Sequence, residues 1–314
     1  MSKVLVIIKS MGIGDLCILI SNIHAISKKV GKPITVLAQH NTRAHEILAN
    51  DPHVEEIIEL NEIEIRGFFN IIKKIKPKKF DQAYIYSDSI RLYLVSKLSG
   101  IKDCFHYTFF SKKGKNFFKT AKEFTENILN TQIDPQPKIY CNSGDAEKIK
   151  KKFGISDNVK NIICGISASG PTKRWGINNY IKLFENLNEK FPCKFFIAAG
   201  PNDEGLIKEI MNSSIGKNCL SFSKMKISEI IPIINSCKFG IFNDTGFAHI
   251  SSALGLKCLV LFMDSPAAAY GTYSKNISIV VPEGETIETC KHNTRGKDKI
   301  SFDEVFNKTL KLIS

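Results

Sequence analysis

The chain has 314 residues, 43% of them hydrophobic and 24% charged, a composition typical of a globular protein with a sizeable core. No run of 18 apolar residues is present, and residues 1–8 are too short for a secretory leader, so we expect a cytoplasmic protein without a membrane span. The formal net charge is +13, and the nine cysteines are scattered without a C-x-x-C pair, which argues against disulfides and a zinc site.

Apolar runs alternate with amphipathic stretches through the first half of the chain. The runs predict β-strands at residues 4–8, 34–38, 56–60 and 82–86, with helices between them that include residues 15–30 and 42–50. Beyond Pro135 and Pro137 the composition becomes polar, and residues 143–153 are expected to form a lysine-rich connecting helix.

A second alternating series fills the rest of the chain. Strands are predicted at residues 162–167, 194–199, 219–222, 239–243, 258–262 and 277–281, and a final helix at 300–313 begins with a capping box at Ser301 and Glu304. Two such series predict an α/β fold with two Rossmann-like domains, residues 1–150 and 151–314, whose parallel sheets face each other across a cleft. Ligands of such sheets bind beyond the carboxyl ends of the strands.

The loop after the first strand contains Gly12-Ile13-Gly14-Asp15. It is similar to the opening of a dinucleotide-binding fingerprint, but Cys17 occupies the third glycine position, so NAD binding is not expected. Gly12 and Gly14 still predict a tight turn where the backbone can approach a ligand. Asp15 falls in the first turn of the next helix, where it has either a chemical role or only the stabilising effect of an acid on the helix dipole.

The strand predicted at residues 239–243 runs directly into Asp244-Thr245-Gly246-Phe247-Ala248-His249. A helix that starts here presents free backbone N–H groups, which can bind a phosphate without a metal. Thr245 can add a hydroxyl, and His249 lies four residues further along the same helical face. A lone histidine on such a helix is more often structural, but its combination with Asp244, Thr245 and Gly246 favours a ligand site.

Two further loops follow predicted strands. The first, Ala168-Ser169-Gly170-Pro171-Thr172-Lys173-Arg174-Trp175, contains a glycine, two cations and the only tryptophan. These cations are either ligands of an anion or ordinary surface charges, and the tryptophan alternatively fills a hydrophobic gap. The second, Gly200-Pro201-Asn202-Asp203-Glu204, ends in a carboxylate that can accept two hydrogen bonds from a ribose diol or can simply begin a helix.

These four segments together resemble glycosyltransferase family 9, the bacterial lipopolysaccharide heptosyltransferases. The resemblance covers nearly the whole chain and is strongest across residues 162–262. It implies a GT-B architecture, with the acceptor bound by the first domain and the nucleotide sugar by the second. By this resemblance Asp15 matches the catalytic base, Lys173 a cation on the donor phosphates, and Glu204 the ribose ligand. The donor loop is matched by Asp244, Thr245, Gly246 and His249.

The resemblance also implies an inverting transfer that uses no metal and no cofactor. The donor would be a nucleotide-diphosphate sugar, in most of the family ADP-heptose, and the acceptor a lipopolysaccharide-type or other anionic glycan or glycolipid. One segment departs from the family pattern: Met263-Asp264-Ser265-Pro266 replaces a glycine and a small polar loop, and its role is open. Two alternatives remain, a sugar-nucleotide epimerase-like enzyme of the same architecture and a non-catalytic nucleotide- or nucleic-acid-binding protein.

The basic excess is concentrated in residues 73–79, 112–122 and 148–152. Solvated helix faces account for most such stretches. The alternative is attraction to an anionic acceptor or membrane surface, for which residues 105–122 are the favoured segment because aromatic side chains alternate with lysines there. This predicts peripheral contact with the cytoplasmic face of the inner membrane. No nucleic-acid-binding motif is recognised, so no nucleic-acid partner is expected.

Overall fold

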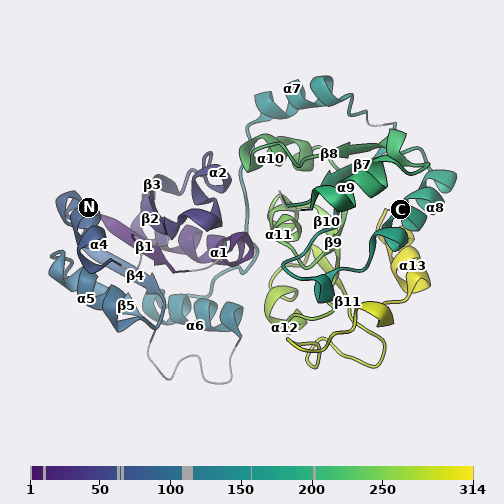
Figure 1. The fold of residues 1–314 in the computed structure, drawn as a ribbon. Helices are drawn as coiled ribbons and strands as arrows, with labels where there is room; N and C mark the ends of the chain where they lie inside the picture. The colour runs from purple at the N-terminus through teal and green to yellow at the C-terminus, as the bar shows by residue number, and fades with distance from the viewer. Residues whose placement is uncertain are drawn as a thin grey trace. The chain divides into compact units, whose positions relative to one another are not determined.

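The computed structural model describes residues 2–9, 12–61, 64, 67–107, 116–156, 158–200 and 203–313. The chain forms two compact units, Met1–Tyr140 and Cys141–Ser314 (Figure 1). Helix α7 (Ser143–Phe153), which the boundary predicted at residue 150 would divide, lies wholly in the second unit. Each unit contains a parallel sheet flanked by helices, which confirms the predicted α/β class.

The first unit is built on a five-stranded parallel sheet in the order β3-β2-β1-β4-β5. Its strands are β1 (Val4–Ile8), β2 (Ile34–Gln39), β3 (Val54–Leu60), β4 (Gln82–Tyr86) and β5 (Asp103–His106). The central strand β1 is buried along its whole length, as expected for an uninterrupted apolar run covered on both faces. Strand β5 is absent from the sequence prediction, because its four residues begin and end with polar side chains.

Helices cover both faces of this sheet. On one face, α1 (Ile13–Val30) packs against α6 (Phe117–Leu129), and the buried Thr125 of α6 hydrogen-bonds to Asn22 of α1 at 2.7 Å. On the other, α4 (Phe68–Ile75) and α5 (Ile90–Leu98) share a core with inward residues of the strands.

The single helix predicted at residues 42–50 is not formed. It is replaced by the 3-10 turn η1 (His40–Thr42) and the short α2 (Ala44–Ile47). The two are separated by Arg43, whose φ of 56° is left-handed and therefore interrupts a right-handed helix.

The second unit contains a six-stranded parallel sheet in the order β11-β10-β9-β6-β7-β8. The strands are β6 (Lys160–Gly165), β7 (Cys193–Ala198), β8 (Cys219–Ser221), β9 (Phe239–Asn243), β10 (Lys257–Leu261) and β11 (Ile277–Val280). The chain moves outward from β6 to β8, returns to β9 beside β6, and then continues in the opposite direction. The strand order therefore reverses between β6 and β9, and in such sheets ligands usually bind beyond the carboxyl ends of the strands at the reversal.

The connections of the second sheet are helical. They include η3 (Pro171–Lys173), α8 (Ile177–Lys190), α9 (Glu204–Met211), α10 (Ile227–Asn235), α11 (Gly246–Ala253), α12 (Ala267–Tyr270) and α13 (Phe302–Ile313). The predicted cap of the last helix is present in part, since the Ser301 hydroxyl accepts a hydrogen bond from the Glu304 N–H at 3.4 Å. Among the described residues, no helix has the length and apolar character needed to span a membrane.

Candidate functional site

The reversal point of the second sheet is unusually close-packed. Gly165 ends β6 beside Phe242 of β9. A Cβ atom at Gly165 would lie 2.6 Å from the Phe242 ring and 3.2 Å from the Thr245 hydroxyl oxygen, so only glycine permits this approach. The loop after β6 is thereby brought against the start of α11.

The buried Asn243 joins the two loops that leave this point. Its amide Nδ2 donates to the carbonyl of Ile166 at 2.7 Å, and its Oδ1 accepts from the Tyr180 hydroxyl at 3.1 Å and from the Trp175 N–H at 3.2 Å. Because all of these groups are buried, replacing Asn243 would leave several of them unpaired, at a cost of about 1–3 kcal/mol each. Asn243 therefore fixes the loop that carries Lys173.

The last two residues of the Lys173–Trp175 segment are structural. Trp175 is 3% exposed, and its indole N–H donates to the carbonyl of Ile300 at 3.3 Å, so it is the hydrophobic plug that the sequence left as an alternative. Arg174 is not an ordinary surface charge, since it forms an ion pair with Asp203 at 2.8 Å. This ion pair joins the loop after β6 to the loop after β7.

The start of α11 is suited to an anion. Thr245 is the residue before the helix, in extended conformation, and its side chain does not cap the helix N–H groups. Its hydroxyl oxygen is buried and makes no hydrogen bond within the described part of the chain. A buried hydroxyl without a partner is costly, whereas one that contacts a ligand is not. The Thr245 hydroxyl and the first N–H groups of α11 are thus able to donate hydrogen bonds to an anion.

Asp244 is held in its ionised form next to this position. Its Oδ1 lies 3.8 Å from Nε2 of His249, and the other ring nitrogen of His249 hydrogen-bonds to the Tyr273 hydroxyl at 2.7 Å. Burial raises the pKa of Asp244, but His249, with smaller contributions from Ser265 and Lys173, outweighs burial and lowers the pKa below its usual value. The buried His249 therefore contacts Asp244 from the interior of the second unit.

The segment of residues 263–266, whose role the sequence left open, is hydrogen-bonded to the loop after β6. The Asp264 carboxylate accepts from the Thr172 hydroxyl at 2.6 Å and from the Arg295 N–H at 3.0 Å. The positive charge of Lys173 contributes to the lowered pKa of Asp264 as well as to that of Asp244. Lys173 ends η3 in the loop after β6, so its charge acts on both carboxylates from the carboxyl edge of the sheet.

Glu204 lies at the same edge, as the first residue of α9 after β7. Its side chain is exposed, and the preceding Asp203 accepts from the Gly200 N–H at 3.2 Å and binds Arg174. The structure thus brings the predicted residues of the second unit to the carboxyl ends of adjacent strands: Lys173, Glu204, Asp244, Thr245, Gly246 and His249.

Asp15 belongs to the other unit, in the first turn of α1, where it is partly buried. The residue before the helix is Gly12, whose φ of −153° is open to any residue, and a Cβ there would meet nothing within 4 Å. Neither backbone strain nor packing within the described residues therefore requires glycine at position 12. Burial, with a smaller contribution from Asp15, raises the pKa of Cys17 far above its usual value, so this thiol stays protonated.

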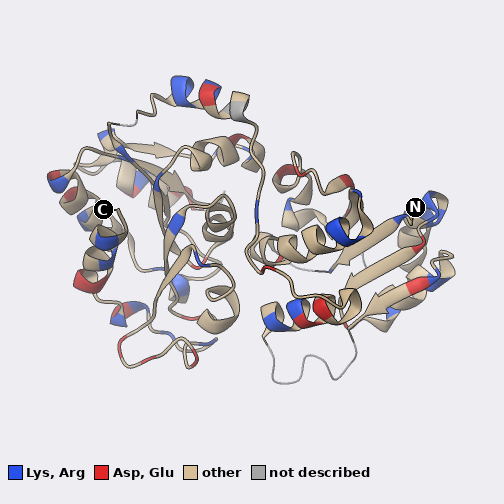
Figure 2. Ribbon diagram, turned by 180° about the vertical axis from the view of Figure 1, so that it is seen from behind, with Lys and Arg blue, Asp and Glu red and all other residues tan. Residues whose placement is uncertain are grey.

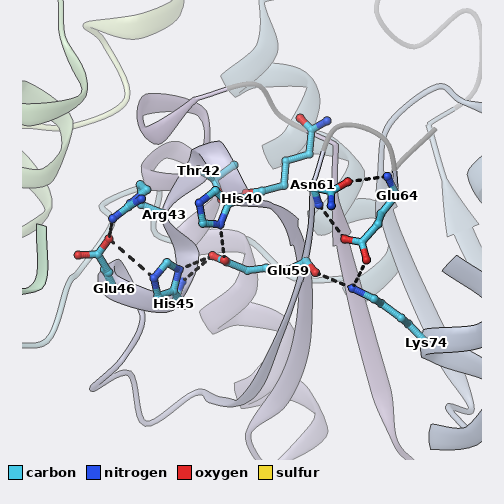
Figure 3. A network of polar contacts seen from close by, with 10 residues as sticks. His40, Thr42, Arg43, His45, Glu46, Glu59, Asn61, Glu64 and Lys74 are labelled. Carbon is cyan, nitrogen blue, oxygen red and sulfur yellow. Dashed lines mark hydrogen bonds and ion pairs between the residues drawn. The ribbon is translucent and has the colours of Figure 1, made fainter. Parts of the chain in front are cut away.

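A polar network on the first unit was not anticipated from the sequence (Figure 3). Glu59, near the end of β3, accepts from His45 at 2.5 Å and contacts Nδ1 of His40 at 3.0 Å. Burial raises the pKa of Glu59, but its hydrogen bonds with the two histidines lower it overall. Lys74 donates to the Glu59 carbonyl at 3.2 Å and pairs with Glu64 at 2.9 Å. The only sequence signal was the polar character of residues 39–46 after the second strand.

Two Rossmann-like parallel-sheet units in one chain define the GT-B class of folds. The model of glycosyltransferase family 9 (heptosyltransferase) matches residues 115–300, more than half of the chain. The chain belongs to this family, and it is therefore a glycosyltransferase, as its motifs had indicated.

Named relatives and solved structures agree with this assignment. Lipopolysaccharide heptosyltransferase 1 of Campylobacter coli is 22% identical over 292 residues, which span 84% of this chain and 85% of the relative. The structure of E. coli ADP-heptose lps heptosyltransferase II superposes with a TM-score of 0.77 at 19% identity, covering 99% of this chain and 98% of the other. A family 9 glycosyltransferase of Veillonella parvula gives a TM-score of 0.82 at 17% identity, covering 99% and 97%.

Proposed function

We propose that this glycosyltransferase transfers a heptose, or a related sugar, from ADP-heptose to a lipopolysaccharide-type or other anionic surface glycan. We propose further that the transfer inverts the anomeric centre, needs no metal and takes place in the cytoplasm at the inner membrane. The sugar and acceptor are supported by the family and by the activities named for its relatives. Membership of this family also argues against the epimerase-like and the non-catalytic alternatives.

One observation carries the proposal for the donor site: the unpaired, buried hydroxyl of Thr245 at the start of α11. A pyrophosphate bound there would accept from this hydroxyl and from the helix N–H groups. Lys173 would supply a positive charge from the loop after β6. These groups can stabilise the negative charge that develops on the leaving nucleotide diphosphate, which is the role of a divalent cation in many other transferases.

The other residues of the second unit would orient the donor. Asp244 is ionised, and a carboxylate in that state can accept hydrogen bonds from sugar hydroxyls next to the pyrophosphate. His249 holds Asp244 in position through their 3.8 Å contact. Glu204, exposed at the end of the neighbouring strand, would bind the ribose diol.

Asp15 would act as the catalytic base. In an inverting transfer the acceptor hydroxyl attacks the anomeric carbon on the face opposite the leaving group, and the hydroxyl proton passes to a carboxylate. Such a base contributes about 10²–10⁴ in rate. In this proposal the first unit binds the acceptor and the second unit binds the donor.

A thermal-shift screen of ADP-, UDP- and GDP-sugars in the presence of EDTA tests donor and metal independence together. The proposal expects ADP-heptose to raise the melting temperature most, with EDTA having no effect. A stronger shift with a UDP- or GDP-sugar would refute the donor, and loss of the shift in EDTA would refute metal independence. Consumption of donor without acceptor would instead indicate an epimerase-like reaction.

A further inference from the structure

Helix α5 exposes an apolar stripe. Ile90, Leu94 and Leu98 are 46%, 45% and 59% exposed, although each is a large aliphatic side chain. They are spaced four residues apart and therefore share one face of the helix. The opposite face is buried through Leu92 and Val95, which pack in the core of the first unit. The helix is thus apolar on both sides, yet only one side is covered.

Helix α4 has a similar outer face. Phe69 is 80% exposed, the highest value among the exposed large hydrophobic side chains of the described chain. Lys73 and Lys76 follow it at helical spacings of four and seven and are also exposed. Because α4 packs against α5 on the same side of the sheet (Figure 1), we take their outer faces together as one surface. We call this surface, Phe69, Ile90, Leu94 and Leu98 with their neighbouring lysines, the α4–α5 face.

The charged residues around this face are mostly basic. By helical spacing, Lys97 and Arg91 fall on either side of the apolar stripe on α5, and the exposed Lys102 follows the helix. Figure 2 colours lysine and arginine residues blue. Lys74 and Lys78 of this region are neutralised by ion pairs with Glu64 and Glu56. Among the described residues, no carboxylate forms an ion pair with Lys73, Lys76, Lys97 or Lys102.

We propose that the α4–α5 face docks on an anionic lipid bilayer. Apolar side chains flanked by cations are the arrangement of helices that lie in a membrane interface, because the apolar residues leave water while the cations meet lipid phosphates. The unpaired positive charge is the reason to choose an anionic lipid surface over a second copy of this basic chain, which would bring like charges together.

The docking surface differs from the segment that the sequence favoured. Of residues 105–122, the lysines at 112, 113 and 115 fall outside the described residues, and Lys122 pairs with Glu126 on α6 at 2.7 Å. Helix α5, in contrast, begins just beyond the carboxyl end of β4, which is the neighbour of β1 in the sheet. If the proposed function is correct, the bilayer would meet the first unit near the edge that carries Asp15, where a lipid-linked acceptor is needed.

The test is co-sedimentation of the full chain with vesicles of phosphatidylcholine alone and of phosphatidylcholine mixed with phosphatidylglycerol. One variant removes the apolar stripe by Ile90→Ser, Leu94→Ser and Leu98→Ser. A second removes charge by Lys73→Gln, Lys76→Gln and Lys97→Gln. A matched control neutralises three exposed lysines of α7 by Lys148→Gln, Lys151→Gln and Lys152→Gln.

Wild type and control are expected to bind the mixed vesicles and not the neutral ones. The charge variant should bind more weakly by about fivefold for each lysine removed, and the apolar variant by at least about tenfold. The proposal would be overturned if the wild-type protein did not bind anionic vesicles, or if it bound neutral vesicles equally well. So would an apolar variant that binds vesicles normally but loses a self-association present in the wild type, which would identify a protein interface.

Sugar transfer to a soluble acceptor without lipid separates this proposal from the proposed function. Every variant should retain that activity, since none of the substituted residues belongs to the candidate site. Vesicle binding without any sugar transfer would sustain the docking surface and contradict the function. Sugar transfer without vesicle binding would sustain the proposed function and contradict the docking surface.

Discussion

Asp15 has one role that the structure shows and a second, catalytic role that we propose. As an acid in the first turn of α1, it stabilises the helix dipole whatever else it does. The substitution Asp15→Asn keeps the shape of the side chain but removes its ability to accept a proton. We expect turnover to fall at least about a hundredfold, with donor affinity and melting temperature close to those of wild type. Turnover and melting temperature are measured on the same preparation, and retained turnover would leave Asp15 with only its role at the helix start.

Removing the single charge of Lys173 tests the proposed donor site. In Lys173→Ala, the lost contact with a phosphate would cost about 1.5–3 kcal/mol, which is roughly ten- to a hundredfold in donor affinity. Calorimetric titration with ADP measures this effect. Lys311→Ala, in the last turn of α13, is the control and should bind ADP like wild type. Equal affinity in both variants would remove Lys173 from the site.

At the scale of elements, the site depends on how closely β6 approaches the start of α11. In Gly165→Ala, the new methyl group would meet the Phe242 ring at 2.6 Å, so β6 and β9 must shift apart. Overpacking of this kind costs about 1–3 kcal/mol. We expect a lower urea midpoint together with weaker ADP binding, because the displaced loop carries Lys173.

Gly12→Ala is the counterpart in the first unit. The structure has open space at this position and a φ that any residue can adopt, so stability should be unchanged. Activity then shows whether the backbone of this turn approaches a ligand, as the sequence suggests. A stable but inactive Gly12→Ala would support that role, and an active one would exclude it.

For the whole molecule, the sequence predicted most strands because long apolar runs mark strands that are buried on both faces. It also predicted the residues at the carboxyl ends of β6, β7 and β9, since each follows its strand directly. What it did not predict depends on contacts between distant segments. The Asp264–Thr172 bond, the hydrogen bonds of the Asn243 side chain and the pairing of Glu59 with His45 all require the strand order to be known. The local sequence pattern also gave a wrong helix at residues 42–50, because Arg43 adopts a left-handed conformation there.

Asp244 connects the proposed chemistry with the stability of the folded chain. Its pKa is lowered on folding, so the ionised carboxylate stabilises the folded state. This contribution is complete above the unfolded-state pKa of about 3.9 and is lost as the pH falls through the lower, folded value. We therefore expect the melting temperature of wild type to fall more steeply than that of Asp244→Asn between about pH 5 and pH 3. The exposed Asp298→Asn serves as the control and should follow wild type. Parallel curves for wild type and Asp244→Asn would show that His249, Ser265 and Lys173 do not stabilise the charge of Asp244.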